Sequence, residues 1–536
     1  MESRGVDRIS GLIDDVLLKI LSLLPSAADA VRTGALSRRW RDLWTRAPGL
    51  RLSFDVPGGK RFAEESSRTM AIIDSVLERH AGAGIDDLEI SFTYKHPGGE
   101  GFGQIFIDGF HADIASRVNA WIQHGARRAA KSLVLMVALP PVLPGGAMRL
   151  ELPASARAET MRLQVIRDAR LSLPAEGTFH ALRDLALAGV AIKDEDGRLG
   201  RLVSSPCCPR LQRLRLLRLR GAERLSVNSD TLEELTILEA VGLRRLEIVA
   251  PSLWMIDIDK CEDFRRSNIA TMAIAAPKLE TLACSTVCPP ERLRIDSASS
   301  VLRLEKVTLI TNGRPSGQDA KNNEGSISLL RQCTGVDHVG LTLQVPDSLW
   351  EEDCEEDRRR GRVRLVLKMI YKEDLLGEVP TLSNITSLEI DVRMGRHSYA
   401  STLGNFLARC ECYNLEYLQI NMTAVLPQLS ESDYHKTPRR ENKVPFPRLR
   451  EVKISGISGT KDETSLLKLL LENAVDLEKM TVEFSSEDEH RGSHARQVVL
   501  DIPCVRGSWI YSDNGVCEWA RTRELLEAPV KAPKLP

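Results

Sequence analysis

The sequence predicts an α/β protein in which a short module of three helices precedes an irregular solenoid of leucine-containing repeats with a parallel β-sheet. Three observations predict this fold. Residues 1–50 carry apolar side chains at helical spacing, and a hexapeptide template with three apolar positions recurs along the rest of the chain. Aromatic residues are only 5% of the composition, and leucine is the commonest apolar residue, as in stacked repeats. A chain of 536 residues is too long for one compact core but suits a repeat array.

The first helix is predicted between residues 13 and 24. Its apolar residues follow the spacing i, i+3, i+4, i+7, i+8, i+11 and therefore share one face: Ile13, Val16, Leu17, Ile20, Leu21 and Leu24. Asp14 and Asp15 suit the positive end of the helix dipole, and Pro25 ends the helix. Leu18 falls well off the main face and Leu23 lies at its edge, so the helix has more apolar surface than one contact requires.

A second short helix is expected at residues 27–33 and a third from about residue 36 to residue 44. Leu36, Trp40, Leu43 and Trp44 are predicted to share one face of the third. Three short helices in about forty residues cannot bury enough surface to be stable alone. Two roles stay open for the module: it caps the repeats, or a partner protein completes its core.

The same residues resemble the F-box of plant F-box proteins. The matching stretches are 7–12 (DRISGL), 14–18 (DDVLL), 23–26 (LLPS) and 36–44 (LSRRWRDLW). In that family the F-box binds a Skp-type adaptor, which connects it to the cullin and RING subunits of a ubiquitin ligase. The sequence departs from the family at Ile13, where proline is usual; proline at the first helical turn pre-sets φ.

The resemblance implies which side chains contact the adaptor. They lie on the first helix, at the break after it and on the third helix: Leu12, Ile13, Val16, Leu17, Ile20, Leu21, Leu24, Pro25 and Trp40. Some of them instead belong to the internal core of the three helices, and the sequence does not separate the two sets.

The template L-x-x-L-x-L, with apolar substitutes, marks the repeats. Copies begin at Leu182, Leu211, Leu232, Leu243, Leu253, Leu279, Val336, Ile385, Leu415, Leu449 and Leu477, and a weaker copy at Ile85. The last two apolar positions of a copy are two residues apart, so both point into the core from one side of a strand. The copies after Leu232 follow at gaps of only 11 and 10 residues, which predicts tight turns, whereas gaps near 30 hold a helix. The alternative is a set of unrelated strands in another α/β fold.

The pattern divides the chain into four regions. They are an F-box at 1–50, an irregular leucine-rich-repeat body at 51–440, a C-terminal repeat block at 441–500 and a tail at 501–536. Residues 444–454 (VPFPRLREVKI), the leucine-rich stretch 464–473 and residues 477–480 (LEKM) resemble the FBD domain that often follows the repeats in plant F-box proteins. Polar stretches are interpreted as loops at 312–326, 351–360 and 428–443.

The residues that flank the second apolar position of each copy face the open side of the sheet. They mix charges and sizes and form neither an aromatic ladder nor a field of one sign, which favours a protein target over nucleic acid. The candidates for target contact are Arg213, Arg215, Arg245, Met255 and Tyr417. The arginine-rich segment 210–224 is also a candidate for binding an acidic or phosphorylated segment; the alternative is one solvated stripe in a charged protein.

Composition narrows the function classes. The net charge of -1 provides no basic field for nucleic acid or a membrane surface, and no apolar run approaches the ~20 residues that span a bilayer. The 11 cysteines form no matched C-x-x-C pairs, which argues against a zinc site and favours a reducing compartment, the nucleus or the cytosol. Because no catalytic or cofactor motif is present, we expect neither enzymatic activity nor a cofactor.

Three functions remain. In the first, the chain is the substrate-recognition subunit of a Skp–cullin–F-box ubiquitin ligase, and its repeats bring a target near the ubiquitin-charged enzyme. In the second, it is an interaction scaffold that has lost adaptor binding, a hypothesis that Ile13 keeps open. In the third, a small molecule fills a pocket between the repeats and the target, as in related repeat-containing F-box receptors.

Overall fold

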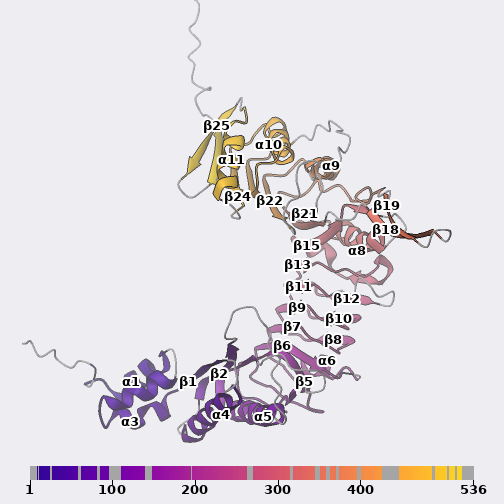
Figure 1. Cartoon of the computed structure of the whole chain (residues 1–536). Helices are drawn as coiled ribbons and strands as arrows, with labels where there is room; N and C mark the ends of the chain where they lie inside the picture. The colour runs from indigo at the N-terminus through magenta and orange to yellow at the C-terminus, as the bar shows by residue number, and fades with distance from the viewer. Residues whose placement is uncertain are drawn as a thin grey trace, which may run out of the picture. The chain divides into compact units, whose positions relative to one another are not determined.

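The structure is a computed structural model that forms two compact units, residues 1–278 with 294–296 and residues 279–293 with 297–536 (Figure 1). The described residues are 9, 11–24, 27–57, 62–80, 85–95, 110–138, 148–194, 196–261, 263, 270–313, 318–344, 350–357, 362–369, 373–394, 400–424, 446–485, 489–503, 506–512 and 516–521. Pro25 and the predicted loop at 428–443 lie outside them.

The N-terminal module is helical. Its elements are α1 (Asp14–Ser22), α2 (Ala27–Arg32), the 3-10 turn η1 (Thr33–Ala35), α3 (Trp40–Leu43) and the 3-10 turn η2 (Trp44–Arg46). The third helix is shorter than expected, because residues 36–39 form a turn in which the Trp40 N–H donates to the Ser37 carbonyl (3.2 Å). Serine favours such turns over helix interiors. Leu36, predicted on the buried face, is 68% exposed.

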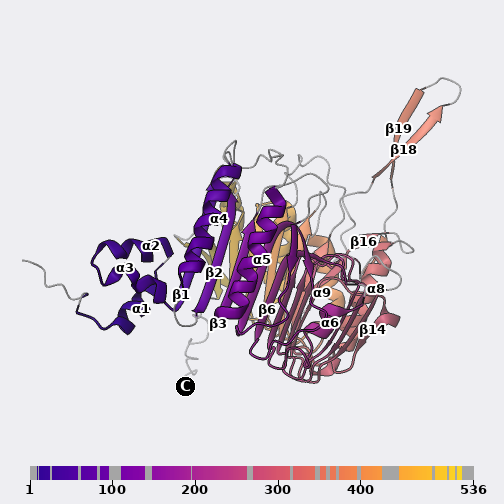
Figure 2. The same ribbon diagram turned by 90° about the horizontal axis from the view of Figure 1, so that it is seen from below.

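A parallel sheet forms the main layer of the first unit. Its strands, in spatial order, are β1 (Gly49–Pro57), β2 (Ile85–Lys95), β3 (Ala129–Ala138), β5 (Thr160–Ser172), β6 (Asp184–Ile192), β7 (Arg213–Leu217), β9 (Glu234–Leu238) and β11 (Met255–Asp259). The short β4 (Met148–Glu151) pairs with the second half of β5. The long helices α4 (Phe62–Arg79) and α5 (Phe110–Arg128) connect the first three strands and run along the sheet (Figure 2).

A second sheet in the same unit contains β8 (Arg224–Asn228), β10 (Arg245–Val249), β12 (Thr271–Ala275) and β14 (Leu293–Ile295). The chain alternates between the two sheets, so that Arg213, Glu234 and Met255, each 21 residues from the next, are neighbours across the main sheet. The turns repeat at the same step: Arg218, Glu239 and Lys260 all have positive φ, at 51°, 56° and 54°. The short helix α6 (Arg198–Leu202) precedes this region.

The alternation corrects one expectation. The tight turns predicted from the 10- and 11-residue gaps are present, but the copy at Leu243 forms β10 in the second sheet and not a strand of the first. Parallel neighbours need a crossover of about a dozen residues or more. A gap of 10 or 11 residues can therefore reach only the opposite sheet.

The second unit contains a further run of parallel strands. Its strands, in spatial order, are β13 (Thr281–Cys284), β15 (Arg303–Ile310), β17 (His338–Gln344), β21 (Ser387–Met394), β22 (Tyr417–Ala424), β23 (Glu451–Ile457) and β24 (Lys479–Phe484). The connecting helices are α8 (Gln318–Gln332), α9 (Ala400–Cys410), α10 (Lys461–Asn473) and α11 (Glu489–Leu500). A capping box between Thr460 and Glu463 begins α10.

Two regions predicted as irregular contain secondary structure. Residues 318–326 begin α8, and residues 351–357 belong to β18 (Trp350–Asp357), which pairs with β19 (Arg362–Met369) as a hairpin. The predicted tail at 501–536 includes β25 (Gly507–Ser512) and β26 (Val516–Arg521), and β26 pairs antiparallel with β24.

The fold class is confirmed: the chain is α/β, and each template copy leads into a strand of a parallel sheet. The first leucine of each of the six copies between residues 182 and 279 is at most 1% exposed.

Candidate docking surfaces of the N-terminal module and the repeat sheets

The N-terminal module has a closed apolar core. Its buried members are Leu17, Leu21, Ala30, Trp40, Leu43, Trp44 and Ala47. Leu12, Leu18, Leu24 and Val76 of α4 are partly buried and pack against this cluster. The contact with Val76 means that the module rests on the body of the first unit as well as on itself.

A second apolar stripe on α1 lies beside the buried one. Ile13, Val16, Ile20 and Leu23 are 66%, 40%, 37% and 67% exposed. At the α-helical rotation per residue these four positions fall within an arc of about 80°, adjacent to the arc of the buried leucines. Exposed apolar surface concentrated on so small a module is typical of a protein docking site.

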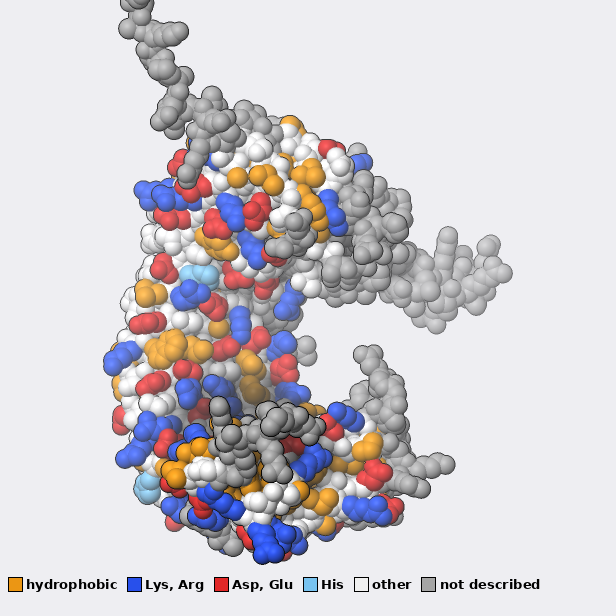
Figure 3. Space-filling view, turned by 90° about the vertical axis from the view of Figure 1, so that its left-hand side faces the viewer, with side chains coloured by type: hydrophobic (Ala, Val, Ile, Leu, Met, Phe, Trp, Pro, Cys, Tyr) orange, Lys and Arg blue, Asp and Glu red, His pale blue; other side chains and the backbone are white. Residues whose placement is uncertain are grey.

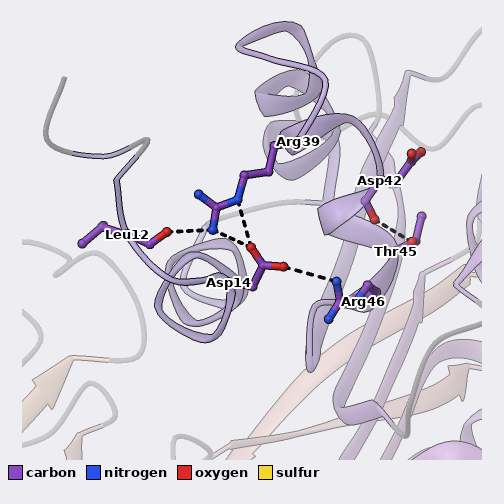
Figure 4. A network of polar contacts seen from close by, with 6 residues as sticks. All are labelled: Leu12, Asp14, Arg39, Asp42, Thr45 and Arg46. Carbon is purple, nitrogen blue, oxygen red and sulfur yellow. Dashed lines mark hydrogen bonds and ion pairs between the residues drawn. The ribbon is translucent and has the colours of Figure 1, made fainter.

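A polar clamp holds the beginning of α1 (Figure 4). The Arg39 guanidinium donates from Nε to Asp14 Oδ1 (2.9 Å) and from Nη2 to the Leu12 carbonyl (2.7 Å). Arg46 Nη1 lies 3.4 Å from Asp14 Oδ2. Hydrogen bonding from Arg39 lowers the pKa of the Asp14 carboxyl below its ordinary value. The N-cap Ile13 has no side-chain cap, so this clamp orders the helix start where the usual proline is missing.

His80 connects the module to α4. It is fully buried, and its Nε2 lies 2.8 Å from the Ala47 carbonyl oxygen, which can only accept, so Nε2 carries the hydrogen. Nδ1 has no hydrogen-bond partner among the described residues. Burial lowers the pKa of His80, and also that of nearby His124, so both imidazoles favour the neutral form.

An arginine cluster surrounds one buried carboxylate on the outer face of the main sheet. Asp184, at the start of β6, has a side chain only 2% exposed. Its Oδ2 lies 3.3 Å from Arg162 Nη2, 3.4 Å from Arg213 Nε and 3.8 Å from Arg215 Nη1. The three arginines come from β5 and β7, the strands on either side of β6. Three basic side chains therefore share one buried carboxylate.

The second unit carries a hydrogen-bonded polar network on its strands. Asn421 Nδ2 donates to Asp391 Oδ1 (2.8 Å) and Glu389 Oε1 (3.0 Å), and Gln419 Nε2 donates to the same Glu389 oxygen (3.1 Å). The Tyr417 hydroxyl donates to Gln419 Oε1 (2.8 Å). Burial, followed by the negative charge of Glu451, raises the pKa of Tyr417. These side chains satisfy one another and are held in fixed positions.

Comparison with known proteins agrees with this architecture. The family described as "FBD-associated F-box protein At5g56370, LRR repeats" matches residues 118–302, and the FBD family matches residues 447–482, from β23 through α10 into β24. An F-box/FBD/LRR-repeat protein of Arabidopsis thaliana is 30% identical over 48% of this chain and 56% of its own length. In its repeats and its FBD region the chain is similar to the plant F-box/LRR/FBD proteins.

Further relatives from Arabidopsis thaliana carry parts of the same combination. An F-box/LRR-repeat protein is 28% identical over 46% of this chain and 63% of its own length, and an FBD-associated F-box protein is 38% identical over 17% and 21%. The matches to the first three relatives span 56%, 52% and 58% of their lengths.

The structure divides the predicted adaptor-binding residues of the N-terminal module into two sets. Leu17, Leu21 and Trp40 are 0%, 3% and 3% exposed and lie in the internal core, so they are not part of an open contact surface. Leu12 and Leu24 line the edge of that core. The exposed members are Ile13, Val16 and Ile20. Leu23, Val31 and Leu36 are also exposed and are not among the predicted adaptor contacts. Leu23 had a sequence signal at the edge of the apolar face of the first helix, and Leu36 had one on the face of the third.

The predicted target-binding residues do not form one surface. Arg213 and Arg215 lie together on β7, and Met255 lies two strands away in the same register row as Arg213. Arg245 belongs to β10 in the second sheet, where it pairs with Arg224 and not with Arg213. Tyr417 belongs to the second unit. Arg162 and Asp184 complete the arginine cluster; the sequence missed Arg162 because β5 lacks a leucine at the first template position.

No cluster of metal-ligating side chains occurs among the described residues. Within the same residues, no helix combines the length and apolarity needed to cross a bilayer. Basic and acidic side chains are interspersed on the face displayed in Figure 3. The features of the described chain that suit binding are therefore the α1 stripe and the polar faces of the sheets.

Proposed function

We propose that this chain is the substrate-recognition subunit of a Skp–cullin–F-box ubiquitin ligase. The F-box binds a Skp-type adaptor through the exposed stripe of α1, and the adaptor connects it to cullin and RING subunits. The repeat sheets hold a target protein. One observation carries the proposal: Ile13, Val16, Ile20 and Leu23 remain exposed although the core of the module is closed without them.

The stripe gains from docking because its apolar surface leaves water on contact. The departure at Ile13 is compatible with this contact. Ile13 is 66% exposed and extends the stripe, and the bonds from Arg39 to Asp14 and Leu12 order the helix start that proline would otherwise pre-set. Both features support adaptor docking over a scaffold that has lost it.

The contribution of this chain to the reaction is positioning. A target bound to the repeats is held near the ubiquitin-charged enzyme, which raises the effective concentration of its lysines. We further propose that the assembly works in the nucleus or cytosol. The unpaired thiols of Cys208 and Cys333 support a reducing compartment, and imaging of a fluorescent fusion tests it.

Co-expression of the full chain with a plant Skp-type adaptor tests the proposal. We expect a stable complex on size-exclusion chromatography that also recruits cullin and RING subunits. A chain that is folded by circular dichroism, yet elutes apart from the adaptor at micromolar concentration, would overturn it.

A further inference from the structure

The arginine cluster on β5 and β7 has an arrangement that ordinary surface ion pairing does not explain. Three guanidinium groups approach the same oxygen of Asp184, at 3.3, 3.4 and 3.8 Å. A surface salt bridge normally joins one cation to one anion and contributes little. Here one carboxylate holds three cations, whose mutual repulsion it only partly offsets.

A small residue, Ala186, separates two of the arginines on the sheet surface and forms the floor of the cluster. Arg162, Ala186 and Arg215 occupy one register row across three neighbouring strands, and Ala186 is the middle member. Adjacent strands are about 4.8 Å apart, so the two arginines start roughly 10 Å from each other with only a methyl group between them. Arg213 enters from the preceding row, beside Asp184. The three arginines therefore converge on Asp184, beside Ala186, and we call this group the arginine cradle.

The guanidinium groups are accessible to a ligand. The side chains of Arg162, Arg213 and Arg215 are 48%, 44% and 35% exposed, while that of Asp184 is 2% exposed. Asp184 is the single carboxylate within ion-pair distance of any of them in the described part of the chain. The three arginines contact the buried Asp184 carboxylate, and their side chains remain partly exposed to solvent.

The charges of the cradle identify its ligand. Three arginines and Asp184 leave two positive charges, and Glu234, aligned with Arg213 on β9, flanks them on one side. A phosphate ester carries about -1.5 to -2 charges at neutral pH and three acceptor oxygens, whereas a carboxylate carries one charge and two oxygens. Planar guanidinium groups also bind phosphate oxygens in pairs. A dianion with three acceptors matches three arginines better than a single carboxylate does.

We propose that the arginine cradle binds a phosphoserine or phosphothreonine in an extended segment of the target protein, with the phosphate above Ala186. The inference rests on the proposed function, because it names the chemistry by which the repeats select a target. The row beyond the cradle is largely apolar and partly exposed at Met136, Leu217 and Leu238, and it offers contact for a neighbouring apolar side chain of that segment. Target recognition then depends on a kinase.

The experiment measures binding of labelled peptide libraries to the full chain in complex with the Skp-type adaptor. The probe is a degenerate library with phosphoserine or phosphothreonine at one fixed position, compared by fluorescence polarisation with the same library carrying serine, threonine or glutamate there. We expect at least about tenfold preference for the phosphorylated library, since charge-assisted hydrogen bonds to guanidinium are involved. Equal binding of phosphorylated and unphosphorylated libraries would overturn the proposal, and equal binding of the glutamate library would overturn its assignment to phosphate.

Variants locate the binding. Arg162→Gln and Arg215→Gln should each weaken phosphopeptide binding by about tenfold or more. Arg183→Gln is the matched control, because Arg183 is 49% exposed and pairs with Glu159 nearby but outside the cradle. Glu234→Gln should tighten binding by a few fold because it removes a flanking negative charge. Ala186→Leu fills the floor without altering charge and should abolish the preference.

Two further readouts separate the possible failures. If Arg162→Gln lowers the melting temperature because Asp184 loses a partner, Glu234→Gln and Ala186→Leu still decide the question. Unchanged affinity in both would overturn the inference. If the adaptor binds but phosphopeptides do not, the cradle assignment fails alone. If phosphopeptides bind but the adaptor does not, the ligase function fails and the cradle remains.

Discussion

Replacing Ile13 and Leu23 together by serine tests whether the exposed stripe of α1 is the adaptor contact. Complete burial of an isoleucine or leucine side chain contributes about 1.5–3 kcal/mol. Ile13 and Leu23 are 66% and 67% exposed, so about two-thirds of that, roughly 1–2 kcal/mol each, remains to be gained on docking. The double variant should therefore lose about 2–4 kcal/mol, which is about a 30- to 1000-fold increase in Kd.

Isothermal titration of the full chain with a Skp-type adaptor measures this change. Ile72→Ser is the matched control, because Ile72 is an apolar residue 50% exposed on α4, outside the stripe, and its loss should leave Kd unchanged. Circular dichroism should show both proteins folded. A double variant that binds within about threefold of the original chain would refute the assignment of the stripe, since even the lower estimate of lost burial exceeds that factor.

Three further predictions concern stability. Arg39 lowers the pKa of Asp14, so the contribution of Asp14 to stability is present above the unfolded pKa near 3.8 and is lost as the pH falls through the folded pKa. Asp14→Asn should remove this acid-sensitive component of the melting temperature. An unchanged dependence of the melting temperature on pH would contradict the prediction. Burial lowers the pKa of His80, so the unfolded chain binds a proton there more readily than the folded chain, and stability should fall as the pH drops below about 6.5. His80→Gln, which retains a donor for the Ala47 carbonyl, should make stability less dependent on pH in this range. Gly189 has a φ of 72°, and a Cβ there would strike the Val165 carbonyl oxygen, so Gly189→Ala should cost about 1–3 kcal/mol or more in denaturant unfolding, whereas Gly377→Ala, with open space around it, should not.

The repeat strands were predictable because the template states directly which side chains enter the core. The template does not predict strands whose first template position holds alanine. Ala158 before β5 and Ala222 before β8 are 0% and 2% exposed and occupy the position that leucine takes elsewhere. A buried alanine fills that position in these two copies, and a template defined by larger apolar residues does not mark them.

The assignment of strands to sheets was less accessible. The step from Leu232 to Leu243 is short enough to exclude a helix, and this was evident from the sequence. That the short step also moves the chain to another sheet follows from the crossover requirement of parallel pairs, which makes Arg224 and Arg245 neighbours in place of Arg213 and Arg245. In this region, residues 21 positions apart in the sequence lie side by side on one sheet, whereas residues of successive template copies do not.

Polar composition misled the assignment of residues 312–326 as a loop. Asn323 is 2% exposed on α8, where its Oδ1 accepts from the Ile310 N–H (2.8 Å) and its Nδ2 donates to the Ile310 carbonyl (2.7 Å). Ser326 donates to the Thr308 carbonyl (2.8 Å). These side chains are polar because they satisfy backbone groups of β15, and not because they face water. Local composition cannot distinguish the two cases.

The surplus of apolar residues on α1 follows from the presence of two contacts on one helix. A helix that packs on a single core requires an apolar arc of about 100°. Leu17, Leu21 and Leu24 already supply that contact, with Trp40 and Leu43 on the other side of the core. Ile13, Val16, Ile20 and Leu23 add nothing to it and leave their apolar surface in water, at a cost that burial by the same module does not recover. Periodicity reports the sum of both arcs, so by itself it does not separate the residues of the internal core from those left exposed. Burial in the folded module separates them, and under the proposed function the exposed set is the adaptor contact.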